Sequence, residues 1–353
     1  MKKYLKYLGY LILFALLYLL FWPVGIDPVA FTPPPNPGLK GVFEKNNKLG
    51  LTKILLQGEG IGPECIAMSS DSFLYTGWQD GKITKFTLEG KKVSDFANTG
   101  GRPLGLQFDK NDNLIVGDEY KGLLSINPKG EVEVLADEVD GTKIFFADDL
   151  DIASDGTIYF TDASQRNHDI ETEVWELQPS GRLISYNPNN KTTKIELDSM
   201  RFPNGVAFGP NEEFLLVNET FGMAIHKLWL KGTKTGQTEI FTNSLPGYPD
   251  NITYNGNGIF WIAIPSVRVP PEFEALFEKP FLRKIAKRLP RALTAAQEPP
   301  PFGMIIAMDL NGDVRMNMQD TTGRIHHVTS VIQIDKSLYI GSLEMDGIGK
   351  LDL

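Results

Sequence analysis

Residues 146–164 read "FADDLDIASDGTIYFTDAS". Two mostly apolar runs flank a turn of Ser, Asp and Gly, which is typical of two β-strands joined by a tight turn. The first run carries Asp148, Asp149 and Asp151 within four positions. Carboxylates this close repel one another, and removing them from water costs free energy. The stretch therefore predicts a β-hairpin whose first strand has a special need for acidic side chains.

The same order of strand and turn recurs from about residue 40 onward. Each unit has a short opening motif, an apolar strand, a polar turn, a second apolar strand that ends in small residues, and a third strand. Further units read "RPLGLQFDKNDNLIVGDEYKGLLSI" (102–126), "FPNGVAFGPNEEFLLVNET" (202–220) and "HHVTSVIQIDKSLYIGSLEMDGIGKL" (326–351). About six units, spaced roughly 40 residues apart, predict an all-β fold, a six-bladed β-propeller. A β-sandwich leaves the near-equivalence of the units unexplained. Segments 41–46 and 51–58 are predicted to supply the outer strand that closes the ring.

Composition limits the functional classes. The chain is 42% hydrophobic, which supplies a large core, and its formal net charge of -9 argues against a nucleic-acid partner. Cys65 is the only cysteine in the sequence, so no internal disulfide forms.

The N-terminus predicts a membrane anchor over residues 1–26. Lys2, Lys3 and Lys6 precede an uncharged apolar run from about Leu8 to Val24. A cleaved signal peptide is the alternative, but no A-x-A-like cleavage site follows the run. We expect a single-pass protein with a cytoplasmic N-terminus and with the propeller on the outer face, whether periplasmic, extracellular or lumenal. Residues 27–40 read as a stiff Pro-rich linker, and residues 41–353 as the propeller.

The blade-opening positions predict a cation site. In a propeller the first strand of each blade lines the central channel, so equivalent residues at one mouth converge on the axis. These positions hold Glu64, Pro103–Leu104, Asp148–Asp149, Asn204, Asp250–Asn251 and His327–Val328. A set rich in oxygen ligands and free of sulfur favours Ca²⁺ over Mg²⁺. The predicted metal ligands are Glu64, Asp148, Asn204, Asp250 and Asn251. Asp149 is predicted to orient ligands or to cap a turn, and Asp151 to be solvated or in a turn. For any single residue, turn chemistry alone remains an alternative.

With these residues in view, the chain resembles the strictosidine-synthase-like family of six-bladed propellers, and in particular its adipocyte plasma membrane-associated branch. It is more distantly similar to paraoxonases, gluconolactonases of the SMP-30 group and diisopropylfluorophosphatase. The motifs that carry the resemblance are "FADDLDIASDGTIYFTDAS", "FPNGVAFGPNEEFLLVNET" and "LPGYPDNI", and the likeness covers about residues 40 to 353. The resemblance implies a channel Ca²⁺ on the five ligands named above, which polarises a carbonyl or phosphoryl oxygen. It also places the carboxylate proposed as nucleophile or base in the phosphotriesterase relative on Asp250.

Three departures from the family pattern bear on function. Most relatives carry Asn at the position of Asp148, so this chain has one more negative charge. Plant strictosidine synthases use a glutamate in the last blade, where this chain has Thr329–Ser330–Val331. Strictosidine synthase activity is therefore not expected. Paraoxonases use a histidine in the second blade, where this chain offers Asp118 and Glu119.

Histidines are further candidates for proton transfer. His326 and His327 open the sixth unit, where a neutral imidazole can activate water. A structural histidine bonded to the backbone is an equally weighted alternative. His168 lies in the polar loop after the third unit; an ordinary surface loop is the preferred interpretation, and a loop that overhangs the channel mouth is the alternative. His226 is predicted to pack on a strand.

The fifth unit is interrupted by a predicted helical insertion over residues 266–301. Its segment 279–291 carries six basic residues, and apolar side chains recur near helical spacing. A lid over the active site and a contact with anionic lipid are both compatible with it; a solvated helix on the rim is the third alternative.

Two functions from different classes follow. The first is a membrane-anchored, calcium-dependent hydrolase of lactones or aryl esters, in which Asp250 or His327 activates water. The second is a non-catalytic propeller that calcium stabilises and that binds a ligand or partner.

Overall fold

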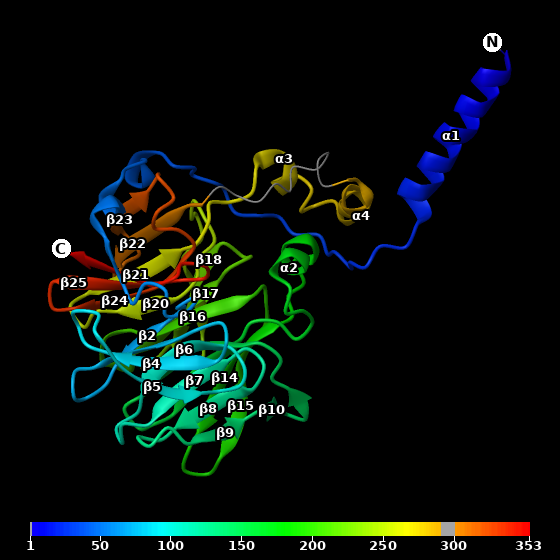
Figure 1. The fold of residues 1–353 in the computed structure, drawn as a ribbon. Coiled ribbons are helices and arrows are strands. Elements are labelled where there is room, and N and C mark those ends of the chain that lie inside the picture. Colours follow the sequence, from blue (N-terminus) through cyan, green and yellow to red (C-terminus); the bar gives the residue numbers. More distant parts are fainter. Residues whose placement is uncertain (1, 291–300) are drawn as a thin grey trace. The chain divides into compact units, whose positions relative to one another are not determined.

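The computed structural model describes residues 2–290 and 301–353. Within these residues the chain forms six four-stranded antiparallel sheets and one two-stranded hairpin. The six larger sheets follow one another along the sequence as blades one to six (Figure 1). This arrangement confirms the predicted six-bladed β-propeller.

The strands have the following bounds. Blade one contains β2 (Ile66–Met68), β3 (Leu74–Gly77), β4 (Lys82–Phe86) and β5 (Lys92–Asn98), and blade two β6 (Pro103–Phe108), β7 (Leu114–Asp118), β8 (Gly122–Ile126) and β9 (Val132–Ala136). Blade three contains β12 (Ala147–Ile152), β13 (Ile158–Asp162), β14 (Gly181–Asn187) and β15 (Thr192–Met200), and blade four β16 (Pro203–Phe208), β17 (Phe214–Glu219), β18 (Ala224–Trp229) and β19 (Thr238–Thr242). Blade five contains β20 (Ile252–Tyr254), β21 (Ile259–Ile264), β22 (Gly303–Asp309) and β23 (Val314–Asp320), and blade six β24 (Val328–Ile334), β25 (Ser337–Ser342) and β26 (Ile348–Asp352). The hairpin consists of β10 (Glu138–Val139) and β11 (Thr142–Lys143).

The ring is closed by a strand from the N-terminal side of the propeller. β1 (Lys53–Leu55) pairs antiparallel with β26, with Lys53 opposite Lys350, and becomes the outer strand of blade six. The prediction for segment 51–58 is therefore confirmed. The prediction for segment 41–46 is wrong, because Gly41 has φ +58° and starts the 3-10 helix η1 (Gly41–Phe43). Two more 3-10 helices are η2 (Lys48–Leu51) and η3 (Pro210–Glu212).

The first strands of the blades surround the propeller axis. Each of them lies beside the first strands of the two neighbouring blades, and the series closes where β24 meets β2. Residues at equivalent ends of these strands therefore face one common region near the axis. This arrangement brings side chains of different blades close to one another.

The core consists of apolar layers between blades. At each of the six junctions, buried side chains of one blade pack against those of the next. Between blades four and five, for example, Phe214 and Leu216 pack with Phe260 and Ile262. A sheet that is covered on both faces needs apolar residues on both faces. This explains the nearly continuous apolar runs, such as residues 259–264, in which strict alternation is lost.

A second compact unit draws on three segments that are far apart in the sequence: the first 33 residues, residues 169–178, and the insertion that begins at Val269. Its helices are α1 (Lys2–Phe21), α2 (Ile170–Glu176), α3 (Pro271–Glu274) and α4 (Pro280–Arg288). Arg283 lies at its centre. This side chain has no solvent exposure and donates hydrogen bonds to the carbonyls of Val29, Trp175 and Phe277.

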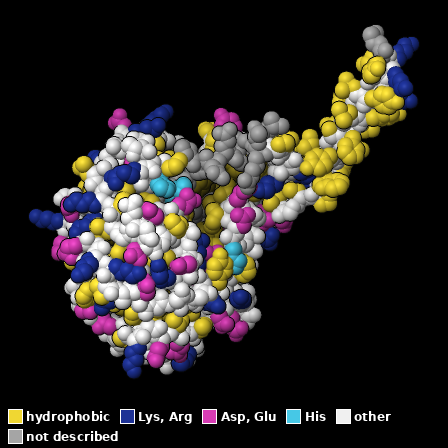
Figure 2. Space-filling view, in the orientation of Figure 1, with side chains coloured by type: hydrophobic (Ala, Val, Ile, Leu, Met, Phe, Trp, Pro, Cys, Tyr) yellow, Lys and Arg dark blue, Asp and Glu magenta, His cyan; other side chains and the backbone are white. Residues whose placement is uncertain are grey.

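Two predictions concern this unit. α1 is long and apolar enough to cross a membrane by its length and composition, and its exposed side chains are mostly hydrophobic, with basic ones at its N-terminal end (Figure 2). α3 and α4 fall within the predicted insertion 266–301, and α4 ends at Arg288. The part of that prediction over residues 291–300 lies outside the described residues.

Candidate active site

A β-bulge recurs at the start of the first strand. In blade three Ala147 pairs with Asp162 and Leu150 with Phe160, so Asp148 and Asp149 together face one residue of β13. The same shift places Asn204–Gly205 in blade four and Thr329–Ser330 in blade six in bulges. A bulge bends the strand locally and re-aims its side chains, and bulges are common next to active sites.

The strand pairing gives six structurally equivalent positions. Five lie two residues before the residue that resumes, or begins, regular pairing with the second strand: Glu64, Asp148, Asn204, Asp250 and Thr329. In blade two pairing resumes at Gly105, so the equivalent position is Pro103. Five agree with the blade-opening positions expected from the sequence. In blade six the sequence repeat indicated His327–Val328, whereas the strand register of the structure places Thr329 at this position.

The polar members of this set are buried and partly unpaired. Glu64, Asp148, Asn204 and Asp250 are each exposed by 5% or less. Among the described residues, one oxygen of each of four side chains is buried without a hydrogen-bond partner: Asp148 Oδ1, Asn204 Oδ1, Asp250 Oδ1 and Asn251 Oδ1. A buried oxygen left unpaired costs about 1–3 kcal/mol. Carboxylate and amide oxygens of this kind are the ligand type that a hard divalent cation prefers.

The pKa shifts of the carboxyl groups in this set also indicate that a cation is needed. Burial raises the pKa of Glu64 to about 7; Arg102 opposes this rise and Glu119 adds to it. Burial also raises the pKa of Asp148 well above its usual range, with further contributions from the charges of Glu64 and Asp250. The pKa of Asp250 is raised in the same way, first by burial and then by Glu64. The three carboxylates are therefore mutually destabilising when ionised without a counterion.

Asp149 and Asp151 link blade three to blade four. Asp149 Oδ2 accepts the N–H of Val206 at 3.0 Å, and Asp151 Oδ2 accepts the N–H of Phe208 at 2.9 Å. Burial nevertheless raises the pKa of Asp149 to about 8 and that of Asp151 to about 6. The prediction that Asp151 is solvated or in a turn is wrong, since this carboxylate bonds to backbone of the next blade.

Threonine hydroxyls fix the backbone of the candidate ligands. Thr329 Oγ1 donates to the carbonyl of Glu64 at 2.8 Å, and Thr161 Oγ1 donates to the carbonyl of Asn204 at the same distance. These bonds run between neighbouring blades, so they tie the opening positions to one another around the axis.

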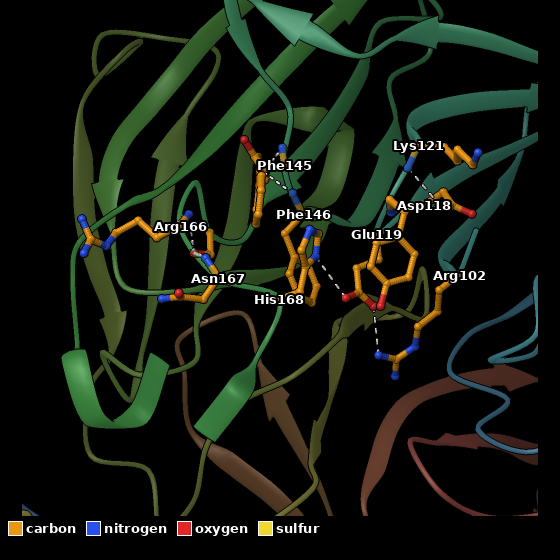
Figure 3. Close-up of polar contacts among 12 residues, drawn as sticks. Arg102, Asp118, Glu119, Lys121, Phe145, Phe146, Arg166, Asn167 and His168 are labelled. Atoms are coloured by element: carbon orange, nitrogen blue, oxygen red, sulfur yellow. Dashed lines mark hydrogen bonds and ion pairs between the residues drawn. The ribbon is translucent and has the colours of Figure 1, made fainter. Parts of the chain in front are cut away.

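A network of charged side chains extends outward from Glu64, and Figure 3 shows its members Arg102, Glu119 and His168. Arg102 places Nη2 at 3.4 Å from Glu64 Oε2 and Nη1 at 3.0 Å from Glu119 Oε2. Glu119 is 1% exposed, and its other oxygen lies 3.2 Å from Nδ1 of His168. His168 lies on the loop after β13 with its side chain 33% exposed, and it contacts the buried carboxylate of Glu119.

The other histidines have different surroundings. His327 has φ +46°, and its Nδ1 lies 3.0 Å from Glu344 Oε2; its ring centroid is 5.2 Å from that of His326. His326, His327 and Glu344 bring one ligand atom each within 4.8 Å of one another. His226 Nε2 pairs with Glu219 Oε2 at 2.8 Å on β18.

Sequence reasoning missed the roles of Arg102 and Thr329 and underrated His168. Arg102 stands two residues before Leu104, and this closeness to a blade-opening position was the available signal. The sequence repeat placed the opening position of blade six at His327–Val328, and only the strand pairing places Thr329 there. His168 lies on the loop after β13, and nothing in the local sequence predicts that it reaches Glu119 from the previous blade.

Comparison with known proteins agrees with this architecture. The strictosidine synthase family model matches residues 148–233, and the strictosidine synthase-like N-terminal model matches residues 41–86. The bovine adipocyte plasma membrane-associated protein is 33% identical over 361 residues, covering 96% of this chain and 86% of that protein. The chain belongs to the strictosidine synthase-like family. Strictosidine synthase-like 6 of Arabidopsis thaliana, another relative, is 37% identical over 321 residues, covering 87% of this chain and 84% of its own length.

Solved structures related to this strictosidine synthase-like chain share its fold. A gluconolactonase from Xanthomonas campestris superposes with a TM-score of 0.63 at 17% identity, covering 94% of this chain and 99% of its own. The calcium-binding protein regucalcin from Agrobacterium tumefaciens superposes with a TM-score of 0.54 at 12% identity, covering 85% of this chain and 90% of its own. At these identities the likeness establishes the propeller fold.

Proposed function

We propose that this protein is a membrane-anchored, calcium-dependent hydrolase of lactones or aryl esters. The observation that carries the proposal is the convergence of Glu64, Asp148, Asn204 and Asp250 at one register position in four blades. Asp148, Asn204 and Asp250 each have a buried oxygen that lacks a hydrogen-bond partner in the described structure. Apolar packing alone does not require four polar groups there, and leaving them unpaired is costly.

The residues fit a calcium ion. Glu64, Asp148, Asn204, Asp250 and Asn251 would hold it through carboxylate and amide oxygens. A cation bound there would supply Lewis-acid polarisation of a substrate carbonyl. Thr329 and Thr161 hold the backbone of two ligands in place, and Asp149 ties the ligand strand of blade three to blade four. Asp250 and His327 are the sequence-based candidates for the proton acceptor.

Other observations support parts of the proposal. The gluconolactonase that shares the fold acts on a lactone by its name, and regucalcin is named as a calcium-binding protein. α1 is an apolar helix of 20 residues at the N-terminus, which suits an anchor, and relatives carry the name of plasma membrane-associated proteins. The basic helix α4 is a second candidate for contact with anionic lipid. Strictosidine synthesis is not proposed, because the matching stretch of the last blade, Thr329–Ser330–Val331, has no acid where those enzymes use a glutamate.

The alternative is a propeller that calcium stabilises without turnover. The extra charge of Asp148 favours it, because a third carboxylate among Glu64 and Asp250 tightens cation binding and weakens the cation as a Lewis acid. Under this alternative the protein binds a ligand or partner, and the bound calcium stabilises the contacts between the blades.

One experiment separates the two functions. The full chain, purified in detergent and stripped with a chelator, is assayed for melting temperature and for hydrolysis of a lactone and ester panel while Ca²⁺ is added back. A hydrolase regains both together, whereas a structural site regains stability alone. Asp250→Asn should then abolish turnover and leave the protein folded. Asp309→Asn is the matched control, since Asp309 ends β22 at the opposite end of blade five. Failure of every substrate at saturating Ca²⁺ would overturn the enzyme proposal.

A further inference from the structure

The strands β7 and β13 end at the candidate site, so the loops that follow them begin there. Pro103 pairs with Asp118, and Ala147 pairs with Asp162, so the ends of these second strands lie at the starts of the first strands. Residues that directly follow Asp118 and Asp162 therefore lie at the same mouth as Asp148. Glu119 is the next residue after β7, and His168 lies six residues after β13.

Glu119 and His168 form a carboxylate–imidazole pair with unequal exposure. The carboxylate is 1% exposed, and the imidazole is 33% exposed. Because Nδ1 of His168 faces Glu119, the other ring nitrogen, Nε2, is directed away from that carboxylate (Figure 3). In the part of the chain that the structure describes, no side chain hydrogen-bonds to Nε2. A histidine held in this way keeps its proton on Nδ1 and presents the lone pair of Nε2.

Two independent links connect this pair to the candidate metal ligands. Arg102 bridges Glu119 and Glu64, with contacts of 3.0 Å and 3.4 Å. The imidazole also stacks on Phe146, with ring centroids 5.7 Å apart and planes at 28°, and Phe146 is two residues before Asp148. The pair therefore lies between the opening positions of blades one and three.

Aromatic rings define the surroundings of the imidazole. Phe145 stacks against it with centroids 4.1 Å apart, and Tyr120 lies 4.9 Å away and is 49% exposed. Tyr120 thus offers an aromatic face beside the His168 ring to a flat or apolar group. This surface suits the aryl group of an ester or the ring of an apolar lactone.

We propose that His168, oriented by Glu119, is the proton acceptor for ester or lactone hydrolysis in this protein. The inference rests on the proposed hydrolase function and assigns its base to a residue other than Asp250 or His327. Nε2 accepts a proton from water as the water oxygen bonds to the carbonyl carbon. The bond from that carbon to the alcohol oxygen then breaks, and the imidazolium returns the proton to this oxygen, which leaves a carboxylic acid and an alcohol. Glu119 is a positioning residue that stabilises the imidazolium.

The test compares two histidines that each pair with a glutamate. His168→Gln should lower kcat by about 100-fold or more, in the range of general-base catalysis, and leave KM and the Ca²⁺-dependent rise in melting temperature unchanged. His226→Gln removes the other such histidine, which lies on β18 and pairs with Glu219, and should leave kcat within about twofold of native. Added imidazole should partly restore turnover by His168→Gly, which a purely structural role does not predict.

Glu119 gives a second readout. The polar groups placed against the His168 ring are Glu119 and Tyr120, with Arg102 one contact further. Glu119→Gln removes the carboxylate that orients the imidazole, so kcat should fall and KM should stay unchanged. The same change in the His168→Gln background should have no further effect on kcat.

The outcomes distinguish the two proposals. Loss of turnover in Asp250→Asn with native kcat in His168→Gln overturns the assignment of His168 and leaves the hydrolase proposal standing. No turnover by the native protein at saturating Ca²⁺ overturns both. Should His168→Gln lower the melting temperature as well, the absence of imidazole rescue in His168→Gly overturns the assignment.

Discussion

The strongest quantitative prediction concerns Glu64 and the pH dependence of stability without calcium. Burial raises the pKa of this carboxyl from an ordinary 4.5 to about 7. Between these two values the folded protein holds a proton that the unfolded chain has lost. The contribution of Glu64 is therefore fully present below about pH 4.5, decreases as the pH rises, and is lost above about pH 7.

The magnitude follows from the difference in proton affinity. At about 1.4 kcal/mol for each tenfold change, Glu64 alone lowers the unfolding free energy by about 3 kcal/mol across this window. The side chain is 4% exposed, so solvent screening reduces the value little. For a domain of this size the change corresponds to roughly 5–10 °C in melting temperature. Ionised Asp148 and Asp250 would add to the loss.

The assay is thermal unfolding from pH 5 to pH 8 in chelator, for the native chain and for Glu64→Gln. Because Gln does not ionise, the melting temperature of the variant should rise relative to that of the native chain as the pH increases. Glu89→Gln serves as the control, since Glu89 is an exposed acid of the same blade. With Ca²⁺ present the native slope should shrink or reverse, because a bound cation favours the ionised form. Parallel curves for native and Glu64→Gln in chelator would refute the reasoning.

Three further predictions concern groups outside the candidate ligands. Arg283→Met removes the donor to several backbone carbonyls at the centre of the helical unit, so limited proteolysis should cleave the insertion faster than in the exposed control Lys284→Met. Arg182→Met leaves the carboxylate of Asp162 buried without its partner at 2.9 Å, which should cost about 3–5 kcal/mol by denaturant unfolding. Burial raises the pKa of the Cys65 thiol, so a thiol reagent should label it only after unfolding; rapid labelling of the native protein would contradict its burial.

The propeller could be predicted because its signal is local and repeated. Apolar strands, Gly- and Asp-rich turns and a spacing of roughly 40 residues recur along the chain, and each unit reports the same geometry. The repeat also places Glu64, Asp148, Asn204 and Asp250 at equivalent positions of their units. A residue's place in a repeat determines where its backbone lies around the axis, so convergence of these four followed from the sequence.

The details of the site required the folded chain. The strand pairing, which resumes at Val331, places Thr329 at the opening position of blade six, where the sequence repeat indicated His327–Val328. Asp151 seemed a turn or solvent residue, yet it accepts an amide of blade four. Glu119 and His168 are 49 residues apart in the sequence, and their pairing joins loops of two neighbouring blades.

The sequence by itself determined the fold class, the blade order and the opening positions of five blades, because strand periodicity and turn chemistry act over a few neighbouring residues. Only the tertiary structure decided which side chains pair at the mouth and which three distant segments meet around Arg283. Those choices depend on packing between blades and on the burial of charge, and both arise only when residues far apart in the chain are brought together.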